Sequence, residues 1–222
     1  MSELGSDLAR RQAGDGTDLQ RSTGIAIQPL DAEHARQTAA LLDDLRVSLF
    51  GIQSARLYAT LAADALQRRI DCRIATTGDQ VCGAVIAAPR SYWLSTLLRH
   101  TGLAFAGIRA RLLARPQRFA GNREAGSAPD APVHGRFDSG PPPRTWADPG
   151  DAWRIIFVGT APEARGLGVA AALYRALMRD RSLIARIAAD NEPSIRLHRS
   201  VGWRLYPDGD VVLAVHVKSA IR

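Results

Sequence analysis

The chain has 222 residues, which is long enough for one domain with a sizeable core and an insertion. Its composition, 46% hydrophobic and 23% charged, is that of an ordinary soluble globular protein. The formal net charge of +7 comes almost wholly from arginines scattered along the chain, because Lys218 is the only lysine. No zinc-ligand spacing, RNP-type aromatic motif or dense basic run accompanies these arginines. The charge therefore favours an acidic small-molecule partner over nucleic acid.

The N-terminal segment gives no sign of export. Residues 1–24 are polar and rich in Gly, Ser and Asp, which predicts a disordered tail that lacks the apolar core of a signal peptide. Elsewhere no apolar run reaches the ~18 residues that a membrane-spanning helix needs. We therefore expect a cytoplasmic protein without a membrane span.

A strand, two helices and a hairpin are predicted before residue 89. Residues 25–30 form the strand, and Asp31 is expected to cap a helix whose apolar residues follow helical spacing. The hairpin covers 71–89 around a turn at 77–80. The second helix covers roughly 54–68, with an inner stripe of Leu57, Leu61, Ala65 and Leu66.

The two cysteines lie on the two strands of this hairpin. Its turn predicts that residue 72 pairs with residue 85 and residue 75 with residue 82, so the sulfur atoms of Cys72 and Cys82 do not face each other. Both are expected to be free, buried thiols, which suits a reducing cytoplasm.

Residues 89–151 interrupt the regular pattern. Residues 91–118 are predicted to be helical, because apolar residues and arginines alternate there at helical spacing. These helices either pack together with their arginines in solvent or dock peripherally on a membrane surface or a partner. Residues 120–150 are rich in Pro and Gly and are expected to form a mobile loop.

Regular elements resume at residue 152. The strand over 152–160 is almost continuously apolar, so we expect it to be buried on both faces. The elements predicted after it are a helix from Arg165 to about Arg181, a strand over 182–190, a short helix over 192–202 and two strands around 207–209.

A glycine loop joins strand 152–160 to the helix that follows. Gly166 and Gly168 let the backbone approach a ligand closely, Ala170 keeps the first helical turn open, and Arg165 adds positive charge. Backbone N–H groups at a helix N-terminus favour anionic oxygens, so the loop predicts a phosphate site. The alternative is a turn that needs glycine only for its dihedral angles.

The same loop also fits the sequence fingerprint of dinucleotide-binding domains. Gly166-x-Gly168-x-x-Ala171 fits that pattern, and Asp190 lies where a ribose-binding acid is expected. Only about thirty residues follow Asp190, which is too few for the further parallel strands of a dinucleotide domain. A nicotinamide-dependent enzyme is therefore disfavoured.

Two motifs resemble those of the GNAT superfamily of acyl-CoA-dependent N-acyltransferases. The run Arg165-Gly166-Leu167-Gly168-Val169-Ala170 resembles its Arg/Gln-x-x-Gly-x-Gly/Ala motif, and Pro162-Glu163 before it also matches. The segment "NEPSIRLHRSVGW" is similar to a second family element, Asn-x-x-(Ala/Ser)-x-x-(Leu/Phe)-Tyr-x-x-x-Gly-(Phe/Trp). The likeness is specific over 152–218 and looser over 25–88.

This resemblance implies the fold. We expect a single α/β domain over 25–220, with a GNAT-like mixed central sheet flanked by helices and a helical insertion between strands three and four. Residues 89–151 lie outside the common pattern and are loosely similar to inserted helices of family members from polysaccharide and amino-sugar pathways.

The resemblance also implies a cofactor site. In the family the strand before the loop splays from the next strand, and the pantetheine arm of acetyl-CoA lies between them without a metal. Here Val158, Gly159 and Thr160 would bond the pantetheine. Asn191 would add a bond from the next strand or would only cap a helix. The pyrophosphate would be held by the amides of Arg165, Gly166, Leu167, Gly168, Val169 and Ala170.

The sequence departs from the family at two catalytic positions. His198 replaces the tyrosine that usually protonates the departing thiolate, and either it acts as acid or hydrogen-bond donor or it is a structural histidine bonded to a neighbour. Arg154 replaces a frequent glutamate base. The general base is unknown, since none of the substitutes Asp151, Asp190 and His134 is convincing.

The sequence thus predicts a cytoplasmic enzyme that transfers an acetyl group from acetyl-CoA to a primary amine by direct attack. We expect the acceptor to be a small molecule, such as an amino sugar or another anionic metabolite. The alternatives are a catalytically impaired CoA-binding module and a basic protein that binds nucleic acid or a membrane surface. A homodimer is left open.

Overall fold

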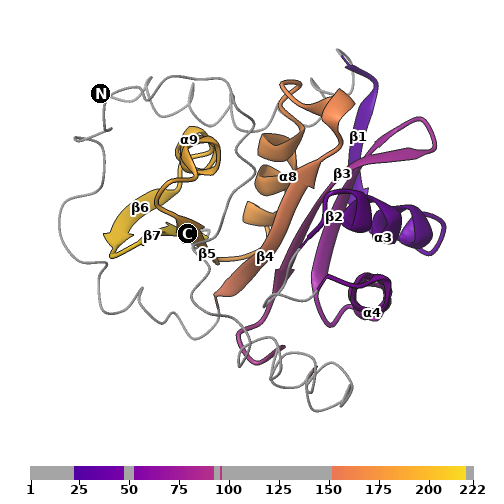
Figure 1. The fold of residues 1–222 in the computed structure, drawn as a ribbon, viewed down its shortest axis with the longest axis horizontal. Helices are drawn as coiled ribbons and strands as arrows, with labels where there is room; N and C mark the ends of the chain where they lie inside the picture. Colours follow the sequence, from indigo (N-terminus) through magenta and orange to yellow (C-terminus); the bar gives the residue numbers. More distant parts are fainter. Residues whose placement is uncertain (1–22, 48–52, 93–95, 97–151, 219–222) are drawn as a thin grey trace, which may run out of the picture.

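A computed structural model describes residues 23–47, 53–92, 96 and 152–218 (Figure 1). Seven strands form one sheet in the order β1-β2-β3-β4-β5-β7-β6. The strands are β1 (Ile25–Pro29), β2 (Asp71–Thr77), β3 (Gln80–Ala88), β4 (Trp153–Thr160), β5 (Leu183–Ala188), β6 (Arg204–Asp208) and β7 (Val211–His216). The helices are α3 (Ala35–Asp44), α4 (Ala55–Leu66), the 3-10 turn η1 (Pro162–Ala164), α8 (Val169–Met178) and α9 (Glu192–Ser200).

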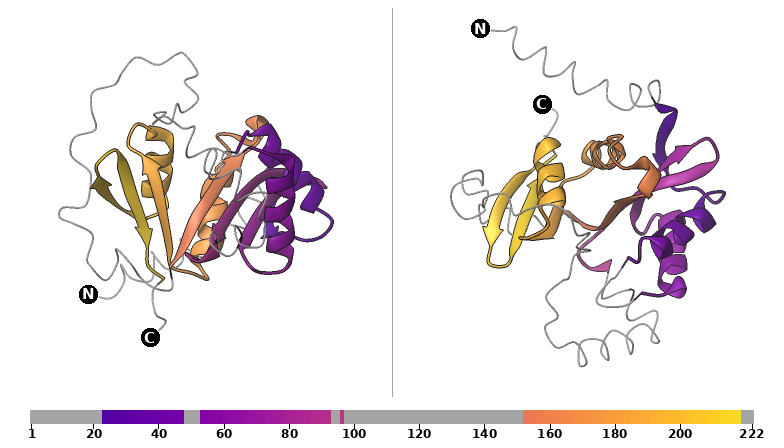
Figure 2. Two further views of the ribbon diagram at one scale, coloured as in Figure 1. Left: turned by 60° about the horizontal axis from the view of Figure 1, so that its bottom comes forward. Right: turned by 45° about the horizontal axis from the view of Figure 1, so that its top comes forward.

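The sheet consists of two halves that meet between β4 and β5. Neighbouring strands pair antiparallel except for β4 and β5, which run parallel. That parallel ladder holds only two pairs, Trp153 with Leu183 and Arg154 with Ile184. Beyond Arg154 the two strands diverge, as the left view of Figure 2 shows.

Helices cover the sheet on both faces. The helices α3 and α4 pack on one face of strands β1–β4, and α8 packs on the opposite face of the same half (Figure 1). The helix α9 packs on β6 and against α8. One hydrophobic cluster therefore lies between the sheet and α8 with α9, and a second lies between the sheet and α3 with α4.

The predicted element order and fold class are confirmed, with local differences. The long helix predicted from Arg165 begins only at Val169, because η1 and the glycine loop occupy the residues before it. The strand β4 is not buried on both faces; its residues from Ile155 to Thr160 are half-buried, since its edge toward β5 lies open beyond Arg154. Leu66, expected on the inner stripe of α4, is exposed.

The hairpin register differs from the prediction by one residue. Cys72 pairs with Ile86 and Ala75 pairs with Gly83, because a β-bulge shifts the register between Ala75 and Thr76. Both thiols are free and buried, as expected. The Cys82 thiol donates to the Ala75 carbonyl (3.4 Å).

The insertion lies between β3 and β4 as predicted. The expected helix over 91–118, the loop over 120–150 and most of the tail over 1–24 fall outside the described residues. Tyr92 and Thr96, which are described, are buried. The Tyr92 hydroxyl donates to the Asp64 carboxylate of α4 (2.8 Å), which fixes where the insertion leaves the domain.

Candidate functional site

The open edge of β4 carries the residues predicted to bond pantetheine. One edge of β4 pairs with β3, where Val158, Gly159 and Thr160 face Val85, Ala84 and Gly83. The other edge pairs with β5 only as far as Arg154. Strand edges present backbone N–H and C=O groups to other partners, so residues 155–160 offer a ladder of such groups.

Gly159 is required by close packing on this strand. A Cβ atom there would lie 2.4 Å from Cζ of Phe157 and 3.0 Å from Cδ1 of Leu45 at the end of α3. The Phe157 ring and Leu45 therefore close over the strand on the α3 face. This contact fixes the end of α3 against the C-terminal part of β4.

The glycine loop has the geometry of an anion cradle. Gly166 (φ 78°) and Gly168 (φ 79°) adopt the left-handed conformation that favours glycine, and Gly168 is the N-cap of α8. Residues 165–168 are exposed. Arg165 donates its own N–H to the Pro162 carbonyl (3.2 Å), whereas across the described residues the N–H groups of 166–171 have no backbone acceptor. These donors lie at the positive end of the α8 dipole.

The start of α8 is held against the sheet by a contact that only glycine permits. Val169, the first residue of α8, is buried. A Cβ atom on Gly83 of β3 would lie 2.9 Å from Val169 Cγ1 and 3.3 Å from Thr160 Cγ2. Gly83 thus lets α8 and the loop approach β3 and β4 closely, and no sequence motif identified this role.

Asn191 caps α9. Its side-chain oxygen accepts a hydrogen bond from the Ser194 N–H (3.2 Å), so the capping interpretation is confirmed. The bond uses the oxygen and leaves the amide nitrogen for other partners. Asn191 is exposed between β5 and α9, so the predicted contact with pantetheine stays a prediction.

His198 lies inside the core. It is 1% exposed, and its ring packs against Tyr174 and Trp203 with centroid distances of 4.7 and 4.8 Å. Its Nδ1 donates to the Ser194 carbonyl (2.7 Å). A neutral imidazole has one N–H, so Nε2 is the bare nitrogen, and it has no partner within the described part of the chain. Burial lowers the pKa of His198, and its bond to Ser194 opposes that change only partly.

Comparison with known proteins was made for the whole chain. Residues 134–203 match the model of the acetyltransferase (GNAT) family. No curated protein matches the sequence. An N-acetyltransferase from Staphylococcus aureus Mu50 has a similar structure, with 15% identity and a TM-score of 0.51, over 86% of this chain and 96% of that one. NAA60 of Arabidopsis thaliana in complex with acetyl-CoA is also similar, with 14% identity and a TM-score of 0.50, over 87% of this chain and 98% of that one.

The family match and the similar folds agree with the two features described above, the glycine loop before α8 and the divergence of β4 from β5. The matched residues include the glycine loop, α8 and α9. The resemblance noted in the two sequence motifs is therefore confirmed. A narrower likeness to polysaccharide or amino-sugar enzymes stays a prediction.

Sequence reasoning missed the buried hydroxyl of Tyr174, whose ring packs against His198. The helical pattern of residues 165–181 gives no reason to single out this hydroxyl. The side chain is fully buried, and among the described residues its hydroxyl has no hydrogen-bond partner. Burial strongly raises the pKa of the phenol, so the hydroxyl stays protonated. The rings of Tyr174 and His198 are thus in contact, and each side chain has one polar atom without a hydrogen-bond partner among the described residues.

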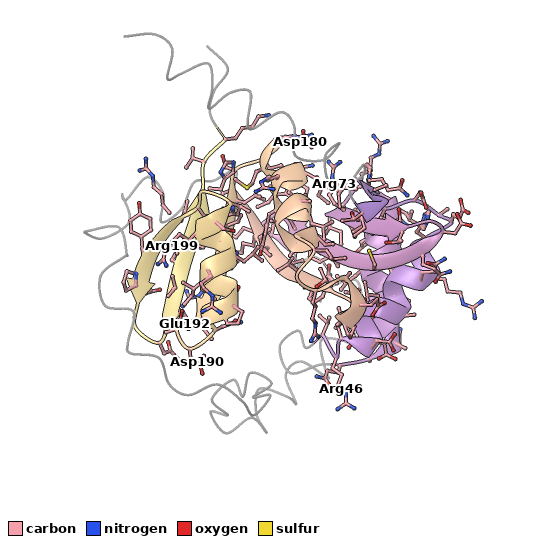
Figure 3. All side chains as sticks on the ribbon, turned by 90° about the horizontal axis from the view of Figure 1, so that it is seen from above. Arg46, Arg73, Asp180, Asp190, Glu192 and Arg199 are labelled. Carbon is pink, nitrogen blue, oxygen red and sulfur yellow. The ribbon has the colours of Figure 1, made fainter. Side chains whose placement is uncertain are left out.

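None of the described candidates is an evident general base. Arg154 is exposed on β4 where the strands diverge. Asp190 is exposed after β5 and lies at the lower left of Figure 3. Asp151 and His134 lie outside the described residues.

A cavity of about 530 Å³ lies beside the glycine loop. Its walls come from the second half of α3 with Leu45 and Arg46, from the start of β3, and from residues 161–165. Four of its lining side chains are charged, namely Asp44, Arg46, Glu163 and Arg165.

The described ranges hold neither a metal-binding cluster nor a helix suited to crossing a membrane. No group of His, Cys, Asp and Glu side chains there is arranged to hold a metal ion. Of the helices in those ranges, none combines the length and the apolar character that a membrane crossing requires.

Proposed function

We propose that this domain transfers an acetyl group from acetyl-CoA to a primary amine by direct attack. One observation carries the proposal: the open edge of β4 is followed, after the single turn η1, by the N–H groups at the start of α8 that have no backbone acceptor among the described residues. A phosphate group and an extended amide chain are the two chemistries that such an arrangement binds. CoA contains both, and the similar NAA60 structure contains acetyl-CoA.

In this proposal the backbone does most of the binding. The amides from Gly166 to Ala170 hold the pyrophosphate, with Arg165 beside them, and Val158, Gly159 and Thr160 bond the pantetheine. A β4 N–H stabilises the oxyanion formed when the amine nitrogen attacks the thioester carbon. The C–S bond then breaks, its electron pair stays on sulfur, and the proton lost by the amine ends on the thiolate.

His198 is the proposed donor to the departing sulfur. In the neutral ring the single N–H is at Nδ1, which donates to the Ser194 carbonyl. Nε2 can therefore donate only when the ring is protonated at both nitrogens, or when the proton moves from Nδ1 to Nε2 and the bond to Ser194 is lost. Burial opposes the cationic form. A buried His198 without a proton on Nε2 favours the second candidate function, a CoA-binding module with impaired catalysis.

The acceptor is proposed to be a small anionic amine, such as an amino sugar. The net charge of +7 supports an anionic partner. Two free buried thiols agree with a reducing cytoplasm as the proposed location.

Two measurements test this function. Calorimetry measures the affinity for CoA, and thiol release from acetyl-CoA in the presence of a panel of amines measures acetyl transfer. A Gly168→Val variant should lose CoA binding, because a β-branched residue resists the left-handed conformation and obstructs the phosphate. Gly209→Val is the control, since Gly209 has φ 65° in the β6–β7 turn and open space around it.

The results separate the candidates. CoA binding that Gly168→Val alone abolishes, together with amine-dependent thiol release, supports the enzyme. CoA binding without thiol release from any amine supports the impaired module. If the wild-type chain binds no CoA but binds nucleic acid or anionic vesicles in a salt-sensitive manner, the proposal is wrong.

A further inference from the structure

The cavity beside the glycine loop brings together two arginines from distant parts of the sequence. Arg46 follows the end of α3, and Arg165 begins the loop whose free N–H groups start at the next residue. Both line the same cavity of about 530 Å³. An anion held by these N–H groups is therefore next to Arg165, on the wall of a cavity that Arg46 also lines.

The backbone of Arg46 is in a conformation that glycine would adopt more readily. Its φ is +49°, in the left-handed region. Two hydrogen bonds end α3 in a Schellman arrangement, from the Arg46 N–H to Asp43 (2.9 Å) and from the Val47 N–H to Leu42 (3.1 Å). Gln53 adds a bond to the Arg46 carbonyl (3.0 Å). The chain thus keeps an arginine where glycine would relieve backbone strain.

The guanidinium of Arg46 is available to a ligand. Arg46 is exposed, and within the described ranges its side chain has neither an ion pair nor a hydrogen bond. Figure 3 shows Arg46 at the lower right of the view and Asp190 and Glu192 at the lower left. Arg73 and Asp180, which pair with each other, lie in the upper part of the same view.

The remaining charges of the cavity determine what it can accept. Asp44 and Glu163 balance Arg46 and Arg165, so the cavity is not a general trap for anions. The group that fits has an oxyanion for the arginines and hydrogen-bond donors for the carboxylates. The pyrophosphate of CoA with the adjoining hydroxyl and amide N–H groups has this composition. Without Arg46 the cavity would hold two acids and one arginine, and would repel the pyrophosphate.

We propose that Arg46 is a second cationic ligand of the CoA pyrophosphate, reaching it from the end of α3 across the cavity from Arg165. This inference rests on the proposed use of acetyl-CoA and adds a binding residue that lies outside both sequence motifs. The end of α3, and not only the loop, then sets the affinity for the cofactor.

The chain offers a matched control for a test by calorimetry. Arg68 ends α4 with φ +57° and the same pair of bonds, from the Arg68 N–H to Ala65 and from the Arg69 N–H to Asp64. It is exposed and does not line the cavity. Arg46→Gly and Arg68→Gly therefore remove the same charge and relieve the same backbone conformation, but only the first touches the cavity.

Arg46→Gly is expected to raise the Kd for CoA about tenfold or more, the effect of losing a charge-assisted hydrogen bond. It should raise the Kd for 3′-dephospho-CoA equally, because that molecule keeps the pyrophosphate. Arg68→Gly should leave both values unchanged, and neither variant should lower the melting temperature. Asp44→Asn should lower the Kd for CoA about threefold, because it removes a repulsive charge, and the difference should shrink at high salt.

Each result decides between the alternatives. The inference is overturned if Arg46→Gly binds CoA like Arg68→Gly, or if the loss disappears with 3′-dephospho-CoA. It is also overturned if Asp44→Asn weakens binding, which would indicate a cationic group in the cavity. A wild-type chain that binds no CoA would overturn the proposed function itself.

Discussion

The Nδ1 atom of His198 lies 2.7 Å from the carbonyl oxygen of Ser194, one helical turn earlier in α9. This bond determines which ring nitrogen holds the proton of the neutral imidazole. Nε2 is left as a bare acceptor between two aromatic rings, and burial lowers the pKa of the ring. The surroundings of His198, which stands where the GNAT motif has a tyrosine, thus favour the neutral imidazole.

A pH dependence of stability follows from this relationship. Burial also lowers the pKa of His216, so both histidines resist protonation in the folded chain while the unfolded chain takes up protons near their ordinary value of 6.5. Their contribution is fully present above about pH 6.5 and is lost as the pH falls below it. Urea unfolding should therefore show a lower free energy of unfolding at pH 5.5 than at pH 7.5. His198→Phe should reduce that difference, and an unchanged difference would show that the ring is not titrating.

The catalytic role of His198 has its own test. If it serves the departing sulfur, His198→Phe should lower kcat about 100-fold and leave the KM for acetyl-CoA nearly unchanged. His198→Tyr should recover activity, because it restores a hydroxyl donor at the motif position. A His198→Phe enzyme with full turnover would assign His198 to the core alone.

Two buried tyrosines should respond oppositely to loss of the hydroxyl. Tyr58 donates to the Val47 carbonyl (2.8 Å), so Tyr58→Phe should destabilise the fold by about 1–2 kcal/mol. The Tyr174 hydroxyl has no partner in the described part of the chain, so Tyr174→Phe should be neutral or stabilising. Urea unfolding of both variants measures this. Equal destabilisation would mean that Tyr174 has a partner after all.

The contact between Gly83 and Val169 should be visible in a double-mutant cycle. Gly83→Ala places a methyl group 2.9 Å from Val169 Cγ1, which should destabilise the fold by about 1–3 kcal/mol and weaken CoA binding by displacing the start of α8. Val169→Ala keeps the loop amide and opens space for that methyl group. The double variant should therefore lose less free energy than the sum of the single variants. Strict additivity would contradict the steric account.

The sequence predicted the parts of the site that depend on local signals. Asn191 precedes a helix that begins Glu192-Pro193, so this boundary could be read from residue type. The glycines identified the loop before α8, but the helix begins at Val169 and not at the predicted Arg165. The bulge after Ala75 and the left-handed Arg46 have no such signal, because bulged strands and unusual helix ends accept many residue types. The contacts of Gly83 and Tyr174 join elements far apart in the chain, so they required the fold.

The point at which β4 and β5 meet is fixed by an ion network that gives the last prediction. The Asp71 carboxylate on β2 accepts from Arg73 Nε (3.0 Å) and from Arg181 Nε (2.9 Å), and its side chain is only 10% exposed. The Arg181 guanidinium lies 3.6 Å from the ring centroid of Trp153, the first β4 residue paired with β5. Asp71→Asn leaves two partly buried guanidinium groups without their shared anion, so it should destabilise the fold by about 1.5–3 kcal/mol in urea unfolding. Asp208→Asn is the matched control, because the Asp208–Arg186 pair (3.5 Å) is about 60% exposed on both sides and should contribute about 0.5 kcal/mol or less. If the two variants unfold alike, the network does not hold the two halves of the sheet together.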